Sequence, residues 1–118
     1  ARRQRQMCIR DRFPHSPYIL PAFFEPGKLS SYCRKPVFSR EGANIRLVRN
    51  GLLLEESGGE YGKEGHVYQQ LVEIPAHNGW YPVIGSWVIG GEPAGIGIRE
   101  TTSRITDNMS HFVPHIIL

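Results

Sequence analysis

The sequence predicts a small β-rich fold, built mainly from antiparallel strands that are joined by hairpins. Its 118 residues are the size of one small domain, and 40% of them are hydrophobic, which is enough for a packed core. Short apolar runs of strand length alternate with turns rich in glycine, proline and asparagine. We find no convincing long helix, and no apolar run approaches the ~20 residues that a membrane-spanning helix needs.

The N-terminal half is expected to hold an irregular segment and three strands. Residues 13–27 contain four prolines among aromatic residues, which favours an ordered connection over a helix or a central strand. Residues 29–38 alternate as a strand whose late proline places that end at a sheet edge or a terminus. Residues 44–49 and 52–55 are predicted to pair, because Asn50-Gly51 between them favours a type I′ turn.

The next segments are predicted to form a loop and two buried strands. Residues 57–65 are rich in glycine and charge, which indicates a mobile loop. Residues 66–74 and 81–89 carry apolar side chains on both sides of the strand. We therefore expect both of them to lie in the interior.

The chain is expected to return after Gly90-Gly91. Residues 94–100 would pair antiparallel with the preceding strand, and residues 101–111 are polar, with room for one helical turn. Residues 112–118 read as an extended apolar end.

The positive charge is concentrated at the N-terminus. Residues 1–12 hold five arginines and one aspartate, whereas the rest of the chain holds nine basic and ten acidic residues. The folded body therefore has no basic face for nucleic acid. Met7-Cys8-Ile9-Arg10-Asp11 back-translates to a sequence like a transposon-based sequencing adapter, so we expect residues 1–12 to be non-native and residues 13–118 to be a C-terminal fragment. The alternative is a genuine basic arm that binds nucleic acid.

Without residues 1–12, Cys33 is the one remaining cysteine. A single cysteine provides neither a disulfide framework nor a pair of metal ligands. Together with the lack of a signal-peptide pattern, this favours a cytoplasmic location. We expect Cys33 to act as a small buried hydrophobic residue rather than as a nucleophile.

Lys35 and the loop after it are candidates for phosphate binding. Lys35 ends an extended apolar run, and a short polar loop with Arg40, Glu41 and Gly42 follows. A sheet commonly presents cations and backbone N–H groups to a phosphate in this way. The alternative is a structural lysine whose ammonium group reaches solvent along its own aliphatic stem.

Arg99 is the second candidate cation. It follows Gly95 and Gly97 on one side of an expected strand, and such a bare strip of backbone lets a ligand approach closely. The alternative is an ordinary ion pair with Glu100 or Glu73.

Three stretches together resemble one family. They are YCRKPVFSREGANI at 32–45, VYQQLVEIP at 67–75, and YPVIGSWVIGGEPAGIGIRE with ITDNMSHFVPH within 81–115. They look like the C-terminal part of the glutathionylspermidine synthase family, which are ATP-grasp enzymes. The resemblance implies an α+β fold class, with this chain as the β-rich, mostly antiparallel C-terminal portion of an ATP-grasp domain.

The resemblance also implies roles for particular residues. Lys35 corresponds to a lysine that contacts ATP, and Arg99 to the arginine that steadies the transferring phosphoryl group. The remaining implied ATP-binding residues are Glu41 and Gly42 in the phosphate-covering loop, Gln69, Gln70, Leu71 and Val72 along the adenine, and Ile105 in the segment that closes the pocket. His111 stands where the family pattern has arginine, and we assign it no role.

The implied activity is ATP-dependent ligation of a carboxylate to an amine through an acyl phosphate. The expected partners are ATP, a peptide- or glutathione-like acid and a polyamine-like amine, with neither nucleic acid nor membrane. Mg²⁺ is expected as a cofactor, with its ligands upstream of this chain, so the chain alone is expected to be inactive. The alternatives are a non-catalytic nucleotide-binding module and a small β-protein with a nucleic-acid-binding arm.

Overall fold

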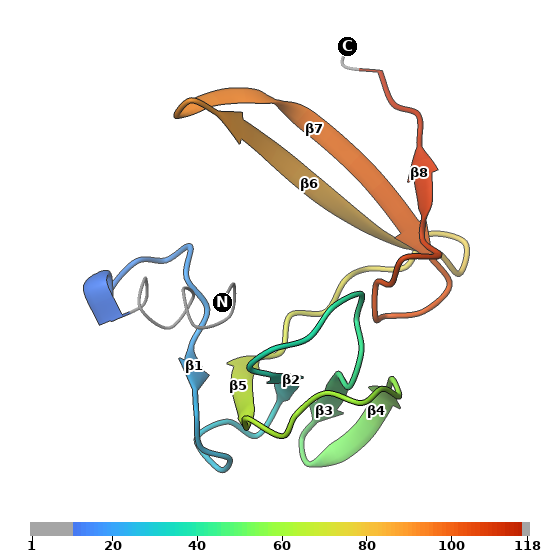
Figure 1. The fold of residues 1–118 in the computed structure, drawn as a ribbon. Helices are drawn as coiled ribbons and strands as arrows, with labels where there is room; N and C mark the ends of the chain where they lie inside the picture. The colour runs from blue at the N-terminus through green and yellow to red at the C-terminus, as the bar shows by residue number, and fades with distance from the viewer. Residues whose placement is uncertain (1–10, 117–118) are drawn as a thin grey trace. The chain divides into compact units, whose positions relative to one another are not determined.

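The computed structural model describes residues 11–116, which form eight strands arranged in two sheets (Figure 1). Residues 1–10, which make up most of the segment expected to be non-native, lie outside the described residues. Every strand pairing is antiparallel, as predicted. Residues 13–116 contain no helix, so the structure does not confirm the helical part of an α+β class.

The chain divides into two compact units, Ala1–Val72 and Glu73–Leu118. Each unit contains one of the two sheets. No helix of the described residues is long and apolar enough to cross a membrane.

The first sheet has five strands in the order β1-β5-β2-β3-β4 (Figure 1). Their bounds are β1 Ala22–Phe23, β2 Tyr32–Pro36, β3 Arg46–Arg49, β4 Leu52–Glu56 and β5 His66–Gln70. β5 lies between β1 and β2, which confirms that the segment from residue 66 forms an interior strand.

β5 ends at Gln70, four residues before the predicted end. The strand stops where its partners stop, because Gln70 lies opposite Tyr32, the first residue of β2. The N–H of Leu71 still donates to the Ser31 carbonyl at 3.2 Å, and the backbone then leaves the sheet. β2 is also shorter than predicted, and its last residue, Pro36, is fully buried. This position confirms that the proline stands at a strand terminus.

The core of the first sheet lies mainly on one face. The antiparallel register places Ala22 opposite Gln69, Gln69 opposite Cys33, and Cys33 opposite Leu47. Side chains that lie opposite each other share a face of the sheet, so these residues form one row across four strands. Ala22, Gln69 and Leu47 are all buried, and Val67 joins them from β5. Cys33 is half-buried within this row.

The hairpin between β3 and β4 forms as predicted. Asn50 and Gly51 have φ values of 49° and 79°, the pair of positive angles that a type I′ turn requires. A β-bulge between Leu47 and Val48 shifts the register, so that Leu47 lies opposite Glu55 and Val48 opposite Leu53. Val48 follows Leu47 on β3 and is buried on the second face of the sheet.

The second sheet has the order β6-β7-β8, with bounds β6 Tyr81–Ile89, β7 Glu92–Thr101 and β8 His111–Val113. β6 and β7 pair along their whole length around a turn at Gly90-Gly91, which confirms the predicted hairpin (Figure 1). β8 pairs with the C-terminal part of β7. Residues 102–110 form bends and turns, and the allowed helical turn is not formed.

The prediction that residues 81–89 are buried is wrong. Ile84, Trp87, Val88 and Ile89 are between 63% and 68% exposed. The apolar pattern correctly indicated a strand, but among its described residues the second unit has no further sheet or helix that could cover β6.

Candidate functional site

Lys35 is held by a hydrogen bond within the first sheet. Its Nζ donates to Oε1 of Gln69 at 2.6 Å. The two side chains share a face, because Lys35 lies two residues after Cys33 on β2 and Cys33 pairs with Gln69 on β5. Gln69 is 6% exposed, so the amide is fixed by the core and in turn fixes the ammonium group. This arrangement gives the sheet one positioned cation.

The loop after β2 contains a tight turn at Glu41 and Gly42. The N–H of Ala43 donates to the Arg40 carbonyl at 2.9 Å. Glu41 and Gly42, at the two central positions, have φ values of 54° and 75°. Both angles are positive, as in a type I′ turn, and the conformation costs Glu41 about 1 kcal/mol because of its Cβ. A residue kept in this strained region indicates that the surrounding structure determines the turn.

Asn44 ties this loop to the glycine-rich segment 57–65. Its Nδ2 donates to the Gly59 carbonyl at 2.9 Å, and its Oδ1 accepts from the Tyr61 N–H at 2.8 Å. Its own N–H donates to the Gly58 carbonyl at 3.1 Å. Asn44 has a φ of 54°, a conformation that asparagine tolerates better than most residues. We call these three hydrogen bonds the Asn44 clasp.

Residues 57–65 form a loop, as predicted. The segment is held by the Asn44 clasp, and Gly59 packs so closely that an added Cβ would lie 2.9 Å from the Cβ of Ala43. Composition indicated a loop correctly, but glycines also permit a close approach of backbone, as happens at this position.

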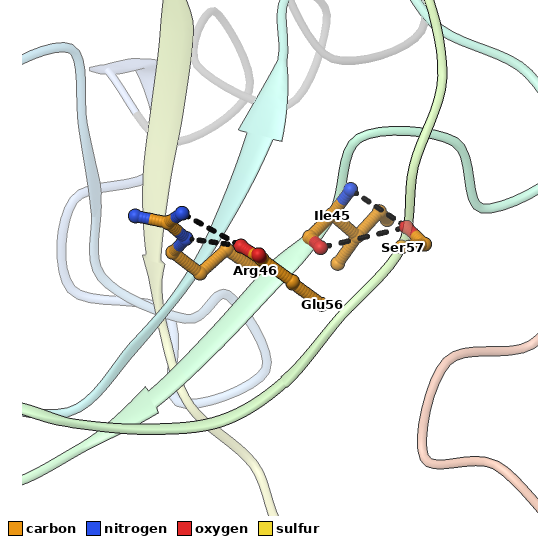
Figure 2. A network of polar contacts seen from close by, with 4 residues as sticks. All are labelled: Ile45, Arg46, Glu56 and Ser57. Carbon is orange, nitrogen blue, oxygen red and sulfur yellow. Dashed lines mark hydrogen bonds and ion pairs between the residues drawn. The ribbon is translucent and has the colours of Figure 1, made fainter.

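The end of the β3–β4 hairpin that lies opposite its turn is connected to the same loop by hydrogen bonds (Figure 2). The Ser57 hydroxyl accepts from the Ile45 N–H at 2.9 Å and donates to the Gly42 carbonyl. At the first residue pair of the two strands, Arg46 donates from Nε to Oε2 of Glu56 at 2.7 Å. The Gly42 carbonyl is thus anchored to the hairpin.

The segment predicted to lie along an adenine, residues 69–72, begins with Gln69, the hydrogen-bond partner of Lys35. Gln70 is the last residue of β5, and its N–H donates to the Pro21 carbonyl at 2.8 Å. Leu71 is half-buried, and Val72 is 56% exposed. Leu71 and Val72 therefore lie beyond the strand rather than within it.

Arg99 lies in the second unit, on β7. It pairs with Val83 on β6 and Phe112 on β8, and it shares a face with the glycines at 85, 95 and 97. Trp87 partly covers this strip, because a Cβ added at Gly97 would lie 3.6 Å from the indole Nε1. At Gly95 an added Cβ would meet nothing within 4 Å. The predicted bare backbone is thus open at Gly95 and lined by an indole at Gly97.

Ile105 is 6% exposed in a loop of the second unit that side-chain hydroxyls organise. The Ser103 hydroxyl accepts from the Ile105 N–H at 2.9 Å, and Asp107 accepts from the Met109 N–H at 2.9 Å. Arg104 places its guanidinium carbon 5.2 Å from the Tyr81 ring centroid, a cation–π contact that joins the loop to β6.

One histidine beside this part of the first unit has a shifted pKa. Burial lowers the pKa of His66 below 6.5, and the positive charge of Arg34 lowers it further. His66 lies opposite Pro36 at the end of β2, and its ring lies under Gly62. The imidazole is therefore held in its neutral form more strongly than in an unfolded chain.

The described residues include no group of three or more His, Cys, Asp or Glu side chains that could hold a metal ion. This part of the chain therefore does not fit a Mg²⁺ site by itself.

The nine predicted site residues are divided between the two units. The first unit brings Lys35 and Gln69 into contact and carries five more of them, and the second carries Arg99 and Ile105. Sequence reasoning missed Asn44 and Ser57, which position the loop. An asparagine next to a predicted turn was the available signal, because asparagine is enriched at positive φ and accepts and donates hydrogen bonds locally.

Comparisons with known proteins give consistent matches. A family model described as "Glutathionylspermidine synthase preATP-grasp" matches residues 7–118. A Haemophilus influenzae protein named "Putative acid--amine ligase" is 44% identical over 114 residues, covering 88% of this chain and 29% of that protein. Trypanothione synthetase of Crithidia fasciculata is 37% identical over 108 residues, covering 88% of this chain and 17% of that protein. The bifunctional glutathionylspermidine synthetase/amidase of Escherichia coli is 29% identical over 110 residues, covering 90% and 18%. The chain thus spans less than a third of the length of these relatives.

Proposed function

The chain belongs to the glutathionylspermidine synthase preATP-grasp family, and on that premise we propose that it is part of an ATP-dependent carboxylate–amine ligase. The family match covers almost the whole chain and confirms the resemblance seen in three stretches of the sequence. The names of the relatives, an acid–amine ligase and two synthetases of glutathione conjugates, support the same class of reaction.

In the proposed reaction, an oxygen of the acid attacks the γ-phosphorus of ATP. This step forms an acyl phosphate and releases ADP. The amine then attacks the acyl carbon, loses a proton and expels phosphate, so that an amide bond forms. Both steps spread negative charge over phosphoryl oxygens, and positioned cations stabilise that charge.

The geometry of Lys35 is the observation that carries this proposal. Its Nζ is fixed 2.6 Å from Gln69 Oε1, in a sheet whose buried face holds the amide still. The neutral amide accepts this hydrogen bond, so the contact orients the ammonium group. We assign Lys35 to a phosphate oxygen of ATP, and we assign the backbone of the Glu41-Gly42 turn, held by Ser57 and Asn44, to the cover over the phosphates.

The remaining assignments are proposals of the same kind. The backbone of residues 69–72 (Gln69, Gln70, Leu71 and Val72) would lie along the adenine, and Ile105 would close the nucleotide pocket. Arg99 would steady the transferring phosphoryl group from the face of β7 that also carries the open backbone at Gly95. Mg²⁺ ligands are proposed to come from residues other than those described, and no step above depends on them.

The acid and the amine are proposed by class. Relatives are named as trypanothione and glutathionylspermidine synthetases, which suggests a glutathione-like peptide as the acid and a polyamine as the amine. A cytoplasmic location is proposed with them, because such thiol peptides are kept reduced there.

The test compares two lysine variants of the 118-residue chain. Lys35→Met removes the positioned cation, and Lys63→Met removes an exposed loop lysine as the matched control. Charge-assisted bonds contribute about 1.5–3 kcal/mol, so Lys35→Met is expected to weaken ATP binding by roughly 10- to 100-fold in calorimetry. Equal affinities for the two variants would contradict the assignment.

Catalysis is tested in a chimaera. In it, this chain replaces the matching 29% of the Haemophilus influenzae relative. We expect the chimaera to release phosphate from ATP only when both glutathione and a polyamine are present. We expect Arg99→Met to abolish this release while ATP binding is retained. Nucleotide binding without phosphate release by the unsubstituted chimaera would instead favour a non-catalytic nucleotide-binding module.

A further inference from the structure

The second sheet carries an aliphatic face that spans all three strands. The register pairs Ile84 with Ile98 and Ile98 with Val113, so these three side chains form one row across β6, β7 and β8. Ile96 lies two residues before Ile98 on β7, and Val88 lies four residues after Ile84 on β6, which places both on the same face. We call the surface made by these five residues the aliphatic face.

The aliphatic face is open to solvent. Ile84 is 67% exposed, Val88 63% and Ile96 40%, while Ile98 and Val113 are half-buried. Single exposed apolar residues are normal on protein surfaces, but contiguous ones mark an interaction site. Four of the five side chains lie on neighbouring positions, and Ser86 separates Val88 from Ile84 on β6. Another layer that covered this face would stabilise the sheet.

The opposite face is also largely apolar. It carries Val83, Trp87 and Ile89 on β6 and Phe112 on β8, around Arg99 and the glycines at 85, 95 and 97. Trp87, Ile89 and Phe112 are 64%, 68% and 80% exposed. The five residues of the aliphatic face include no charged group, and branched aliphatic side chains suit dry packing against another layer.

We propose that the aliphatic face docks permanently against a further part of the same polypeptide, in the region that longer members of the family carry and this chain does not match. The inference rests on family membership and on the sheet, and it does not depend on the ligase reaction. A transient protein partner fits less well, because non-obligate interfaces are about as polar as ordinary surface, whereas this face resembles a domain core cut in half.

The length of the relatives favours a covering layer from the same polypeptide. This chain matches 29%, 17% and 18% of three relatives, so each of them carries a much longer polypeptide around the matched region. A covalently linked layer is present at high effective concentration and can cover the face without a separate binding event. A second copy of this chain is the competing occupant, and the experiment separates the two.

The experiment measures the accessibility of residue 84 in two contexts. Ile84→Cys is introduced into the 118-residue chain and into the chimaera that carries this chain in the Haemophilus influenzae relative. Reaction of that cysteine with a maleimide is followed by mass spectrometry of the peptide that contains it. Lys63→Cys, on an exposed polar loop, is the control in both contexts.

In the chain alone, both cysteines should react quickly and at rates that do not depend on protein concentration. In the chimaera, labelling at position 84 should become at least about tenfold slower, because it must await local opening, while position 63 is unchanged. Equal labelling of position 84 in the two contexts would overturn the proposal. So would protection of position 84 in the chain alone that grows with protein concentration, because that result identifies a second copy as the occupant.

A second measurement covers the case of a chimaera that does not fold. The chain alone should bind a hydrophobic dye such as anilinonaphthalene sulfonate, and Ile84→Glu should lower that binding, whereas Leu52→Glu on the first sheet, at 73% exposure, should lower it less. Dye binding that is absent, or that both substitutions reduce equally, would refute the existence of a distinct aliphatic docking face.

Discussion

Replacing Asn44 by alanine should remove the side-chain hydrogen bonds that hold the loop with the Glu41-Gly42 turn. Asn44→Ala removes the donor to the Gly59 carbonyl, at 2.9 Å, and the acceptor of the Tyr61 N–H, at 2.8 Å. It also places an alanine at a φ of 54°, where asparagine is tolerated and alanine is strained.

The magnitude follows from these two effects. Both hydrogen bonds are exposed to solvent, so each contributes about 0.5 kcal/mol, at the low end of the usual range. The left-handed conformation costs alanine about 1 kcal/mol. The free energy of unfolding should therefore fall by about 2 kcal/mol, which corresponds to roughly 10 °C in the melting temperature of a unit of this size.

Asn44→Gly separates the two effects. Glycine also lacks both side-chain bonds, but it adopts a positive φ without strain, so its loss should be about 1 kcal/mol. Both variants are measured by urea unfolding, followed through tyrosine and tryptophan fluorescence. If glycine destabilises the chain as much as alanine does, then conformational strain is not part of the effect and the reasoning is refuted. If Asn44→Ala changes the free energy by less than about 0.5 kcal/mol, the clasp is not formed in solution.

Three further predictions concern the surroundings of the same loop. Burial, and then the charge of Arg34, lower the pKa of His66 in the folded chain, so the free energy of unfolding should be constant above pH 6.5 and should fall as the pH drops through the folded pKa. His66→Gln should make the free energy from urea unfolding less dependent on pH over that window. An unchanged pH dependence would contradict the assignment. Gly62→Ala should destabilise the chain by about 1–3 kcal/mol in the same assay, because its φ is 114° and a Cβ would lie 2.9 Å from His66 Nε2; a neutral result would mean that the histidine ring moves freely. Glu56→Gln should cost only about 0–1 kcal/mol, since both side chains of the Arg46–Glu56 pair are substantially exposed, and adding salt should reduce even that difference.

The sequence predicted most local structure because local structure depends on neighbouring residues. Asn50-Gly51 accepts two positive φ angles, so the β3–β4 hairpin could be predicted from two letters. The apolar run at 81–89 gave the bounds of β6 correctly, and the two glycines after it located the turn. The end of β5 could not be predicted, because it depends on where β1 and β2 stop rather than on its own residues.

For the candidate site, the sequence likewise indicated individual residues but not the contacts between them. The alternation of residues 29–38 pointed to Lys35, but not to its bond with Gln69, which joins residues 34 positions apart through strand register. The Asn44 clasp was missed for a similar reason, since its partners lie 15 and 17 residues further along the chain. Composition indicates a loop, whereas hydrogen bonds between two loops depend on how their flanking strands pair.

The sequence by itself determined most of the strands, the hairpins and the family, since each is encoded in short patterns of side-chain period, turn residues and specific motifs. It did not predict β1 (Ala22–Phe23), which lies in a segment expected to be irregular. The tertiary structure decided which residues meet and which faces remain uncovered. It placed Lys35 against Gln69, closed the loop with Asn44 and left Ile84 on an open aliphatic face. The physical reason is that alternation specifies what each side of a strand requires, whereas contact and burial depend on which other segments reach that side.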